Sequence, residues 1–585
     1  MCHNSATDSL SFNSNGEVVV HVQARILTYL FVSSLIGLTI GAVVSLAANG
    51  FVKGLSYLET VRGFMAQHLI SSSLPFSIWP FVWLFVGFGL VVSLKRLGKC
   101  DLWQGPADAI YCAHRPDKDM PVRQGIASIF AAFVSLGAGA SLGQYGPIVH
   151  MGALIGNASR RLVNSSVLSN DVFLGCGVAA AISAGFQAPI AGLIFAHEAV
   201  LRHFSAKAVA PIAISSICAA SLGDWLFSDS DILSLSAEPL SLIGQVPGLL
   251  LGGLAFGFVA VAMMKASLGG MAFIKSLKLP FSVLACGVVL VLGTIGAFVP
   301  ETVGVGMTAL TGVLAGTYAT DALFFLLIAK FAAFLVSICF GFVGGFVSPA
   351  LFLGAISGGL LASVLSAIGF EVSSLTLMVA GMAAVSGTIV GAPISMVMLV
   401  FELTESYNFA VSAMLSVVVA NLLSHVMFSH SVFDEQLRRR NIDVSKGRGN
   451  LVLIERNVCE IMQTSFMTFL PDTPVKTVIE QLSENKQTEA YCVTEEGGYV
   501  GKLFLPQLIK AHPKTVSQNC LLAADKVIPA EASIFQAIEI ATDFVGEAMA
   551  VIDSQSGIIK GIVTEADLFS VYLEAQSDVH KLEHG

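Results

Sequence analysis

The chain contains few charged residues. Only 12% of its 585 residues are Asp, Glu, Lys or Arg, whereas 55% are hydrophobic. Because a soluble protein carries about a quarter charged residues, most of this chain is expected to lie in a lipid bilayer. The formal net charge is -9, and no run of Lys or Arg is of the kind that binds nucleic acid.

Sequence features of metal sites, enzymes and secreted proteins are also lacking. The 10 Cys are scattered, without CxxC pairs or His partners at zinc-finger spacing, so neither a disulfide framework nor a metal site is indicated. We find no pairing of a nucleophile with a base, and we expect no enzymatic activity and no required cofactor. The first two dozen residues are polar and lack the regions of a signal peptide.

A series of apolar stretches could cross a bilayer, for which about 20 helical residues are needed. They lie at residues 26–48, 78–94, 125–142, 174–195, 208–226, 246–264, 281–299, 322–342, 351–368, 375–403 and 410–428. Several are short or interrupted by Gly and Pro, and such breaks are tolerated only where the backbone is buried in protein or lines a cavity. We predict an all-α, multi-pass membrane domain.

The composition changes after Phe428. Arg438, Arg439 and Arg440 follow the last apolar stretch, and the positive-inside tendency predicts a cytoplasmic C-terminus, with the N-terminus on the same side of a bacterial inner or plasma membrane. The remaining sequence predicts two small α/β domains, with helices near 475–485 and 534–542 and a strand near 548–553. The expected boundaries are 1–24 for a cytoplasmic segment, 25–437 for the membrane domain, 438–456 for a linker, and 457–512 and 520–577 for the two small domains.

The membrane part repeats itself. Gly143–Pro147 reads GQYGP, and Gly345–Pro349, 202 residues later, reads GFVSP. A second pair of blocks, 204 residues apart, matches Ala188-Pro189-Ile190 and Glu198 with Ala392-Pro393-Ile394 and Glu402. Chance spacing of small residues is the alternative, but ordered matches across two blocks favour a structural repeat whose broken helices meet near the bilayer midplane.

The repeated loops indicate an anion as ligand. In each, a Gly-rich loop with a Pro precedes a helical pattern; Gly allows a close approach of the backbone, and Pro suits a first helical turn. A helix that begins there directs unpaired N–H groups and the positive end of its dipole at the gap. Two such ends can replace part of the hydration shell of an anion without a buried positive charge.

These motifs resemble those of the CLC chloride channels and proton/chloride antiporters, over roughly residues 26–437. GQYGP stands in the place of the family's GREGP motif, and GFVSP in the place of its GxFxP motif. The resemblance implies the CLC fold, with two inverted halves, and a homodimer with one pore per subunit. The anion-pathway residues that it implies are Trp103, Gln104, Gly105, Gly143, Gln144, Tyr145, Gly146, Pro147, Gly345, Phe346, Val347, Ser348, Pro349 and Phe433.

The family's third motif, GSGIP, is degraded here to Leu102–Pro106, which reads LWQGP. Alignment on the Pro places Trp103 at the anion-coordinating Ser of the family, whereas the spacing to the next motif favours Gln104, and one sequence does not decide between them. The position of the family's inner-gate Tyr falls on Phe433, which has no hydroxyl group.

Both glutamates that the family's antiporters use for protons are missing. The gate position holds Tyr145, a phenol that with an ordinary pKa of about 10 stays neutral at pH 7, and the inner position holds Ala199. Tyr145 can donate a hydrogen bond to an anion or block the path with its ring. His150, His197 and Glu198 could relay protons, although a packed, hydrogen-bonded His is the more common case.

The tail resembles a tandem CBS pair. Gly561–Asp567 reads GIVTEAD and matches the family's GIVTxxD segment, in which the Thr and the Asp contact phosphate and ribose of a nucleotide. The resemblance thus implies Thr564 and Asp567 as a possible adenine-nucleotide site. In the first half, Phe504 and Gln507 replace these polar residues, so one site at most is expected, and a purely structural dimerisation role is equally compatible.

The sequence therefore favours passive, proton-independent permeation of chloride by a homodimer. A proton/anion antiporter with a displaced proton route, and a non-conducting membrane sensor that signals through its CBS pair, are the two alternatives.

Overall fold

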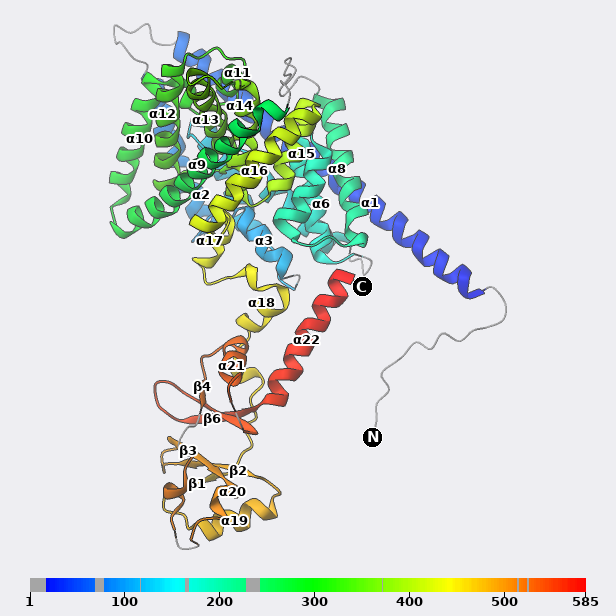
Figure 1. The fold of residues 1–585 in the computed structure, drawn as a ribbon, viewed down its shortest axis with the longest axis vertical. Helices are drawn as coiled ribbons and strands as arrows, with labels where there is room; N and C mark the ends of the chain where they lie inside the picture. Colours follow the sequence, from blue (N-terminus) through cyan, green and yellow to red (C-terminus); the bar gives the residue numbers. More distant parts are fainter. Residues whose placement is uncertain are drawn as a thin grey trace. The chain divides into compact units, whose positions relative to one another are not determined.

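The computed structural model describes residues 17–68, 78–115, 117–163, 168–227, 242–370, 372–512, 515–522, 526–544 and 546–584. The chain divides into two compact units, a helical unit (Met1–Asn441) and a tail unit (Ile442–Gly585). Figure 1 labels the elements of both. The first 16 residues of the predicted cytoplasmic segment lie outside the described residues.

Helices account for nearly all regular structure described in the helical unit. They are α1 (Glu17–His68), α2 (Trp79–Gly98), α3 (Pro106–His114), α4 (Val122–Gly137), α5 (Tyr145–Val163), α6 (Asn170–Phe186), α7 (Pro189–Phe195) with the π-helix η1 (Ala196–Leu201), α8 (Ala206–Phe227), α9 (Leu242–Ser276), α10 (Phe281–Phe298), the 3-10 helix η2 (Pro300–Thr302), α11 (Met307–Leu314), α12 (Thr320–Cys339), α13 (Val347–Ala367), α14 (Ser374–Val390), α15 (Pro393–Thr404), α16 (Tyr407–Met427) and α17 (Val432–Arg438).

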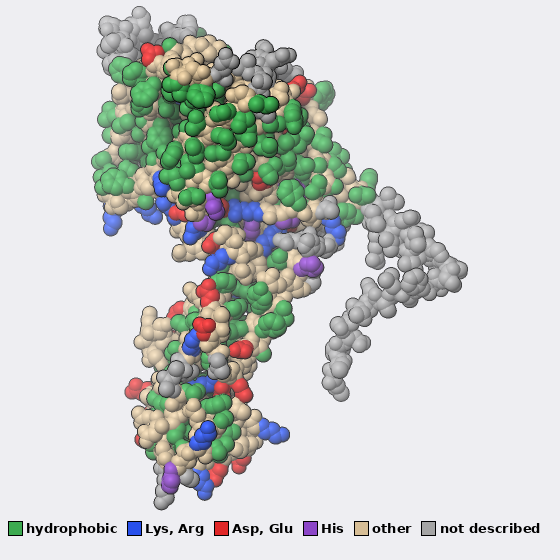
Figure 2. All heavy atoms as spheres, viewed as in Figure 1, with side chains coloured by type: hydrophobic (Ala, Val, Ile, Leu, Met, Phe, Trp, Pro, Cys, Tyr) green, Lys and Arg blue, Asp and Glu red, His purple; other side chains and the backbone are tan. Residues whose placement is uncertain are grey.

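Within the described residues, seven helices are long and apolar enough to cross a membrane, and several shorter apolar helices accompany them. Figure 2 shows hydrophobic side chains in a broad band over the helical unit, with Lys and Arg gathered along one edge of it. Large apolar side chains of the helical unit are exposed, such as Phe325, which is 68% exposed. Because water would penalise such a surface, the band is a surface for lipid, as the composition predicted.

Two of the predicted membrane stretches are not single helices. The stretch 174–195 divides into α6 and α7, and 375–403 divides into α14 and α15. At the breaks, Gln187 (φ 55°) and Gly391 (φ 76°) adopt left-handed backbone, and Pro189 and Pro393 begin the following helices. Since Pro cannot continue a preceding helix, the helix boundaries lie at the Ala-Pro pairs that the repeat had singled out.

Other boundaries also differ from the sequence prediction. α1 extends well beyond the predicted 26–48, and α4 ends before the end of 125–142. The short helices α3 and α11 were not predicted, because their 9 and 8 residues carry no membrane-length apolar run. α17 follows the last predicted stretch.

The repeat predicted from the sequence appears as two matching helix pairs, α5 with α6 and α13 with α14. A Cβ on Gly152 would overlap the backbone of Gly177, and a Cβ on Gly354 would overlap the backbone of Gly381. These four glycines occupy equivalent repeat positions. Their missing side chains let the backbones of each pair touch, as small residues do at close helix crossings in membranes.

The tail unit has a different, mixed architecture. Its elements are η3 (Val444–Lys446), α18 (Arg448–Glu455), η4 (Val458–Glu460), β1 (Thr468–Phe469), α19 (Val475–Glu484), β2 (Glu489–Val493), β3 (Tyr499–Phe504), α20 (Leu505–Leu508), η5 (Ser517–Cys520), β4 (Val527–Pro529), α21 (Ile534–Ala541), β5 (Ala548–Ile552), β6 (Ile559–Thr564) and α22 (Glu565–His584). The helices predicted near 475–485 and 534–542 and the strand near 548–553 agree with α19, α21 and β5.

The tail contains two sheets of the same topology, β1-β2-β3 and β4-β5-β6. In each, the first strand pairs parallel to the second, and the second pairs antiparallel to the third. The corresponding pairs Ala490–Leu503 and Met549–Val563 show that the two registers also match. The tail is thus an internal duplication, with an apolar core in each half.

The close glycine contacts predict a strong effect of a single methyl group. Gly177→Ala places a Cβ well inside the van der Waals contact distance to Gly152 O, and we expect overpacking to destabilise the helical unit by about 1–3 kcal/mol. Thermal unfolding of the purified protein in detergent measures this. Gly89→Ala on α2 is the control, since nothing lies within 4 Å of its added Cβ. Equal unfolding temperatures for the two variants would contradict the close packing of α5 on α6.

Candidate anion site

The two repeated loops are joined directly by their backbones. Gly143 N donates to Gly345 O at 2.8 Å, and Gly345 N donates to Gly143 O at 2.6 Å. This reciprocal pair forms an isolated antiparallel bridge between segments 202 residues apart in sequence. The contact fixes the two loops, and hence the helices that follow them, against each other.

Glycine is required at this contact for steric reasons. A Cβ on Gly143 would lie 2.9 Å from both Gly345 O and Ser348 N, and a Cβ on Gly345 would lie 2.8 Å from Gly146 N. Real Cβ atoms do not approach backbone atoms so closely without displacing them. The motif glycines therefore serve the approach of one loop to the other.

Two helices begin at this contact. α5 starts at Tyr145 and α13 at Val347, and Pro147 and Pro349 stand in their first turns. The first amides of a helix have no partner within it and carry the positive end of its dipole. Ser348 Oγ is buried beside Gly143 and has no hydrogen-bond partner among the described residues. The junction thus offers hydrogen-bond donors suited to an anion.

Tyr145 is the first residue of α5 and stands at this junction. Its side chain is 2% exposed and stacks on Phe186 at the end of α6, with ring centroids 3.6 Å apart. Gly185 leaves room for the ring, because a Cβ there would lie 3.3 Å from it. The stack with Phe186 was not predicted. Of the other motif residues, Phe346 turns away and packs edge-on against Phe334 of α12.

The degraded third motif lies at the same place. A Cβ on Gly146 would lie 3.7 Å from Pro106, the first residue of α3, so all three motifs converge. Gln104 donates its backbone N–H to Ser128 Oγ at 2.9 Å, and its side-chain amide lies 3.4 Å from Gln124. Trp103 is partly exposed in the same loop. Which of the two replaces the motif's Ser stays open.

Phe433, at the predicted inner-gate position, is buried in α17. This helix packs against α3 and α14. Its N-terminus is capped by Ser431, whose hydroxyl accepts from Asp434 N at 3.2 Å, and Asp434 forms an ion pair with Arg202. These contacts hold α17, and Phe433 with it, against α3.

The carboxylate of Glu198 caps a helix of the other repeat. It accepts hydrogen bonds from Ile394 N (2.9 Å) and Ser395 N (2.7 Å) at the start of α15. Glu402 does the same for α7, accepting from Ile190 N and Ala191 N, both at 2.7 Å. This exchange between repeats was not predicted, although Glu198 and Glu402 were matched as repeat positions. Glu198, which the sequence offered as a proton relay, thus has a structural role as the cap of α15.

A group of three titratable residues includes His197, which stands two positions before Ala199, and the rings of His197 and His203 are 6.5 Å apart between centroids. His197, on the π-helix, places Nδ1 2.8 Å from His203 O, and His203 Nε2 lies 3.2 Å from Asp171 Oδ2. Nε2 of His197 is buried without a hydrogen-bond partner among the described residues. The other predicted histidine, His150, holds Gly105 O at 3.2 Å through Nδ1. His203 and Asp171 had not been singled out in the sequence.

In the tail, Thr564 and Asp567 bond to each other at the start of α22. Asp567 Oδ2 accepts from Thr564 N (3.0 Å) and Asp567 N donates to Thr564 Oγ1 (3.1 Å), which is the pattern of a helix capping box. Thr564 Oγ1 also donates to Asp567 Oδ2 at 2.7 Å. The same carboxylate oxygen accepts from Gln463 at 3.0 Å. The two residues thus bond to each other, and Thr564 Oγ1 and Asp567 Oδ2 already have partners.

A buried ion pair in the first half of the tail, which also bonds to the second half, was missed. Lys502 Nζ lies 2.7 Å from Glu489 Oε2 and donates to Ala548 O at 2.6 Å. Glu489 accepts from the backbone amides of Glu547 and Ala548. The available signal was a charged residue within each of two apolar strands, since such residues are seldom buried unless paired.

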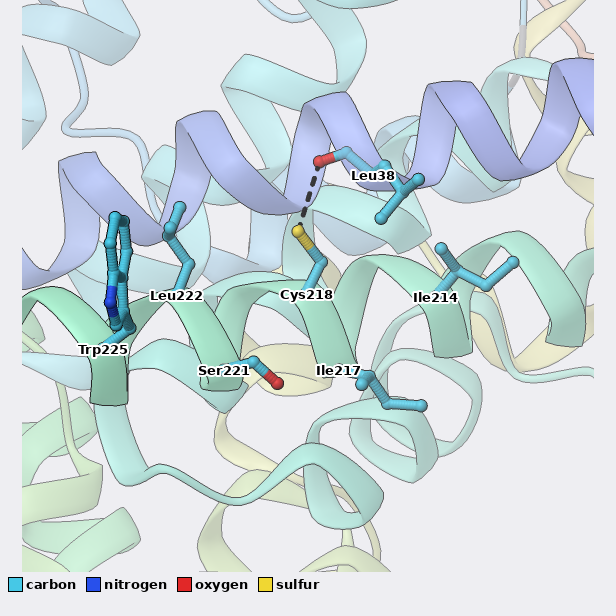
Figure 3. Close-up of a pocket in the computed structure, with 7 residues that line it drawn as sticks. All are labelled: Leu38, Ile214, Ile217, Cys218, Ser221, Leu222 and Trp225. Atoms are coloured by element: carbon cyan, nitrogen blue, oxygen red, sulfur yellow. Dashed lines mark hydrogen bonds between the residues drawn. The ribbon is translucent and has the colours of Figure 1, made fainter.

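A separate groove of about 400 Å³ lies between α1 and α8 and is lined mainly by apolar side chains. Figure 3 shows its lining residues, with Cys218 Sγ donating to Leu38 O at 3.5 Å. It contains none of the predicted site residues. The groove belongs to the apolar outer surface and is distinct from the candidate anion site.

Comparison with known proteins supports both units. The sequence model for voltage gated chloride channels matches residues 86–425, and that for the CBS domain matches residues 458–511. The chain is 26% identical over 367 residues to a putative chloride channel protein ClcB-like of Ralstonia nicotianae, covering 62% of this chain and 84% of that protein. It is 25% identical over 433 residues to the H(+)/Cl(-) exchange transporter ClcA of Salmonella agona, covering 71% and 89%.

Solved structures share the fold. A slow cyanobacterial Cl-/H+ antiporter superposes with a TM-score of 0.62 at 18% identity, covering 70% of this chain and 97% of that one. A eukaryotic CLC transporter superposes with a TM-score of 0.59 at 16% identity, covering 92% and 98%. The predicted fold class, a helical CLC fold followed by a CBS region with small mixed sheets, is confirmed.

Proposed function

The chain belongs to the voltage gated chloride channel family, and we propose that it conducts chloride passively across a membrane, without moving protons in exchange. The proposed assembly is a homodimer in the bilayer, with one anion pathway per subunit and both termini in the cytoplasm. The pathway would run past the junction of α5 and α13, where backbone amides and Ser348 offer hydrogen-bond donors to a small anion.

The proposal of uncoupled permeation is based mainly on Tyr145, the residue at the gate position. The family resemblance assigns a glutamate to the position of Tyr145, where a carboxylate would both block the anion and carry a proton. A neutral phenol stacked on Phe186 does not exchange protons near pH 7. At the inner proton position the chain has Ala199, and the carboxylate of neighbouring Glu198 is occupied by α15.

An antiporter with a displaced proton route is the second candidate. The group of His197, His203 and Asp171 favours it, because imidazole is the side chain that exchanges protons near neutral pH and His203 bonds to Asp171. A proton would still have to cross the 6.5 Å between the ring centroids of His197 and His203. The similar ClcA of Salmonella agona is an H(+)/Cl(-) exchange transporter. The gate position would have to take part in such a route, and Tyr145, which stays neutral near pH 7, would not pass the proton on. We therefore place this candidate second.

For the tail we propose a structural pairing module with one adenine-nucleotide site at Thr564 and Asp567. The corresponding residues of the first half, Phe504 and Gln507, offer neither a hydroxyl group nor a carboxylate. A nucleotide ribose would compete with Gln463 for Asp567 Oδ2. The ion pair of Lys502 with Glu489 would hold the two halves together in either case.

Proton coupling is tested in liposomes that contain the purified protein, with chloride flux and pH recorded together. We expect chloride flux with no uphill proton movement at any pH between about 5 and 8, the range in which a relay His would titrate. Proton pumping that disappears with the chloride gradient would favour the antiporter. Absence of any flux would favour a non-conducting sensor.

Substitution of Tyr145 tests the gate. Tyr145→Phe should change flux or anion selectivity by the equivalent of one hydrogen bond, about 1–2 kcal/mol, if the hydroxyl contacts the anion. Tyr145→Ala should raise flux because the ring is removed, and Tyr145→Glu should make permeation pH-sensitive. Tyr407→Phe on α16, whose ring is exposed, is the control. Unchanged flux in all three Tyr145 variants would mean that this side chain does not face the pathway.

Nucleotide binding by the tail is tested by calorimetry on the full chain in detergent, with ATP, ADP and AMP. We expect binding by the wild type, and a loss of about tenfold to a hundredfold in affinity for Asp567→Ala, because a hydrogen bond to a charged group is worth about 1.5–3 kcal/mol. Gln507→Ala changes the equivalent position of the first half and should bind as the wild type does. No binding of wild type at millimolar nucleotide would leave pairing as the function of the tail.

A further inference from the structure

An ion pair joins the end of the helical unit to the beginning of α3. Arg440 Nη1 lies 2.7 Å from Asp108 Oδ1, with side chains 29% and 15% exposed. The two residues are 332 positions apart in sequence. Because the pair is largely withdrawn from water, its charges are screened less than those of a surface pair.

The second oxygen of Asp108 fixes the loop of the third motif. Asp108 Oδ2 accepts from Gly105 N at 2.7 Å, and Asp108 N donates back to Gly105 O at 3.0 Å. Gly105 is the N-cap residue of α3. The carboxylate thus sets where α3 begins, and Pro106 at that point approaches Gly146 of the candidate anion site.

A carboxylate in this place has a cost for anion permeation. It stabilises the N-terminus of α3 through the helix dipole, but it also puts a negative charge near the path proposed for a small anion. A carboxylate near the path would repel an anion there, and the repulsion is stronger in a medium of low dielectric constant than in water. The guanidinium of Arg440 supplies the compensating positive charge.

We infer that Asp108 and Arg440 form a positioning and charge-compensating pair for the anion pathway. Asp108 holds Gly105 and the first turn of α3 in place, and Arg440 removes the repulsion that this carboxylate would exert on the anion. The inference rests on the proposed anion conduction. Neither residue belongs to the three motifs. The carboxylate of Asp108 makes both contacts, one to Gly105 N and one to Arg440.

The pair makes a prediction with opposite signs for its two members. Arg440→Gln leaves the carboxylate uncompensated, so the half-saturating chloride concentration should rise about fivefold at low ionic strength. Asp108→Asn keeps an oxygen for Gly105 N but leaves Arg440 unneutralised, so the half-saturating concentration should fall by about the same factor. The double variant with Asp108→Asn and Arg440→Gln should have a half-saturating chloride concentration close to that of the wild type. Raising the ionic strength with an impermeant salt should shrink both shifts.

The measurements are chloride flux from liposomes and calorimetric titration of chloride on the purified full chain. Arg439→Gln is the matched control: the neighbouring Arg439 pairs with Glu435 and donates to Leu268 O at 2.8 Å, and its loss should leave chloride affinity unchanged. Arg440→Lys keeps the charge and should stay near the wild type even if Arg440→Gln folds poorly.

Shifts in the same direction for Asp108→Asn and Arg440→Gln, or a double variant that does not recover, would overturn the inference and leave a purely structural pair. An equal effect of Arg439→Gln would do the same. These results are distinct from a failure of the proposed function, in which the wild type itself would neither conduct nor bind chloride.

Discussion

The reciprocal hydrogen bonds between Gly143 and Gly345 are the contact on which the helical unit depends. They bring two loops from distant parts of the sequence to van der Waals distance, and each loop ends in a helix whose first amides have no partner within the helix. The positive ends of α5 and α13 therefore meet inside the protein. A site of this kind attracts an anion through dipoles rather than a full charge, so the anion can also leave.

Other contacts of the helical unit also occur in equivalent pairs, one in each repeat. Glu198 caps α15 and Glu402 caps α7, so each repeat supplies the N-terminal cap of a helix in the other. Gly177 and Gly381 let α6 and α14 press against α5 and α13. The tail is a second internal duplication, and the ion pair of Lys502 with Glu489 in its first half bonds to the backbone of the second half at Ala548. In both units, hydrogen bonds from carboxylates to backbone amides hold related segments together.

Motif reasoning from the sequence predicted the fold class, the repeat and the meeting of the loops, because Gly and Pro leave distinct local signals. It did not predict the partners of Glu198, Tyr145 or Asp108. Those partners, Ser395, Phe186 and Arg440, lie far away in sequence, and pairings of this kind depend on tertiary geometry. The reading of apolar runs predicted one membrane stretch where the structure has α6 and α7, and another where it has α14 and α15. An apolar run alone does not show where a residue with left-handed backbone ends a helix.

Direct observation of a bound halide tests the account at its centre. Bromide carries the charge of chloride and can be located by anomalous diffraction from crystals grown or soaked in bromide. The account predicts an anomalous peak at the junction of α5 and α13, within hydrogen-bonding distance of their first amides or of Ser348 Oγ. A well-ordered map with no peak there, or with bromide bound only elsewhere in the helical unit, would contradict it.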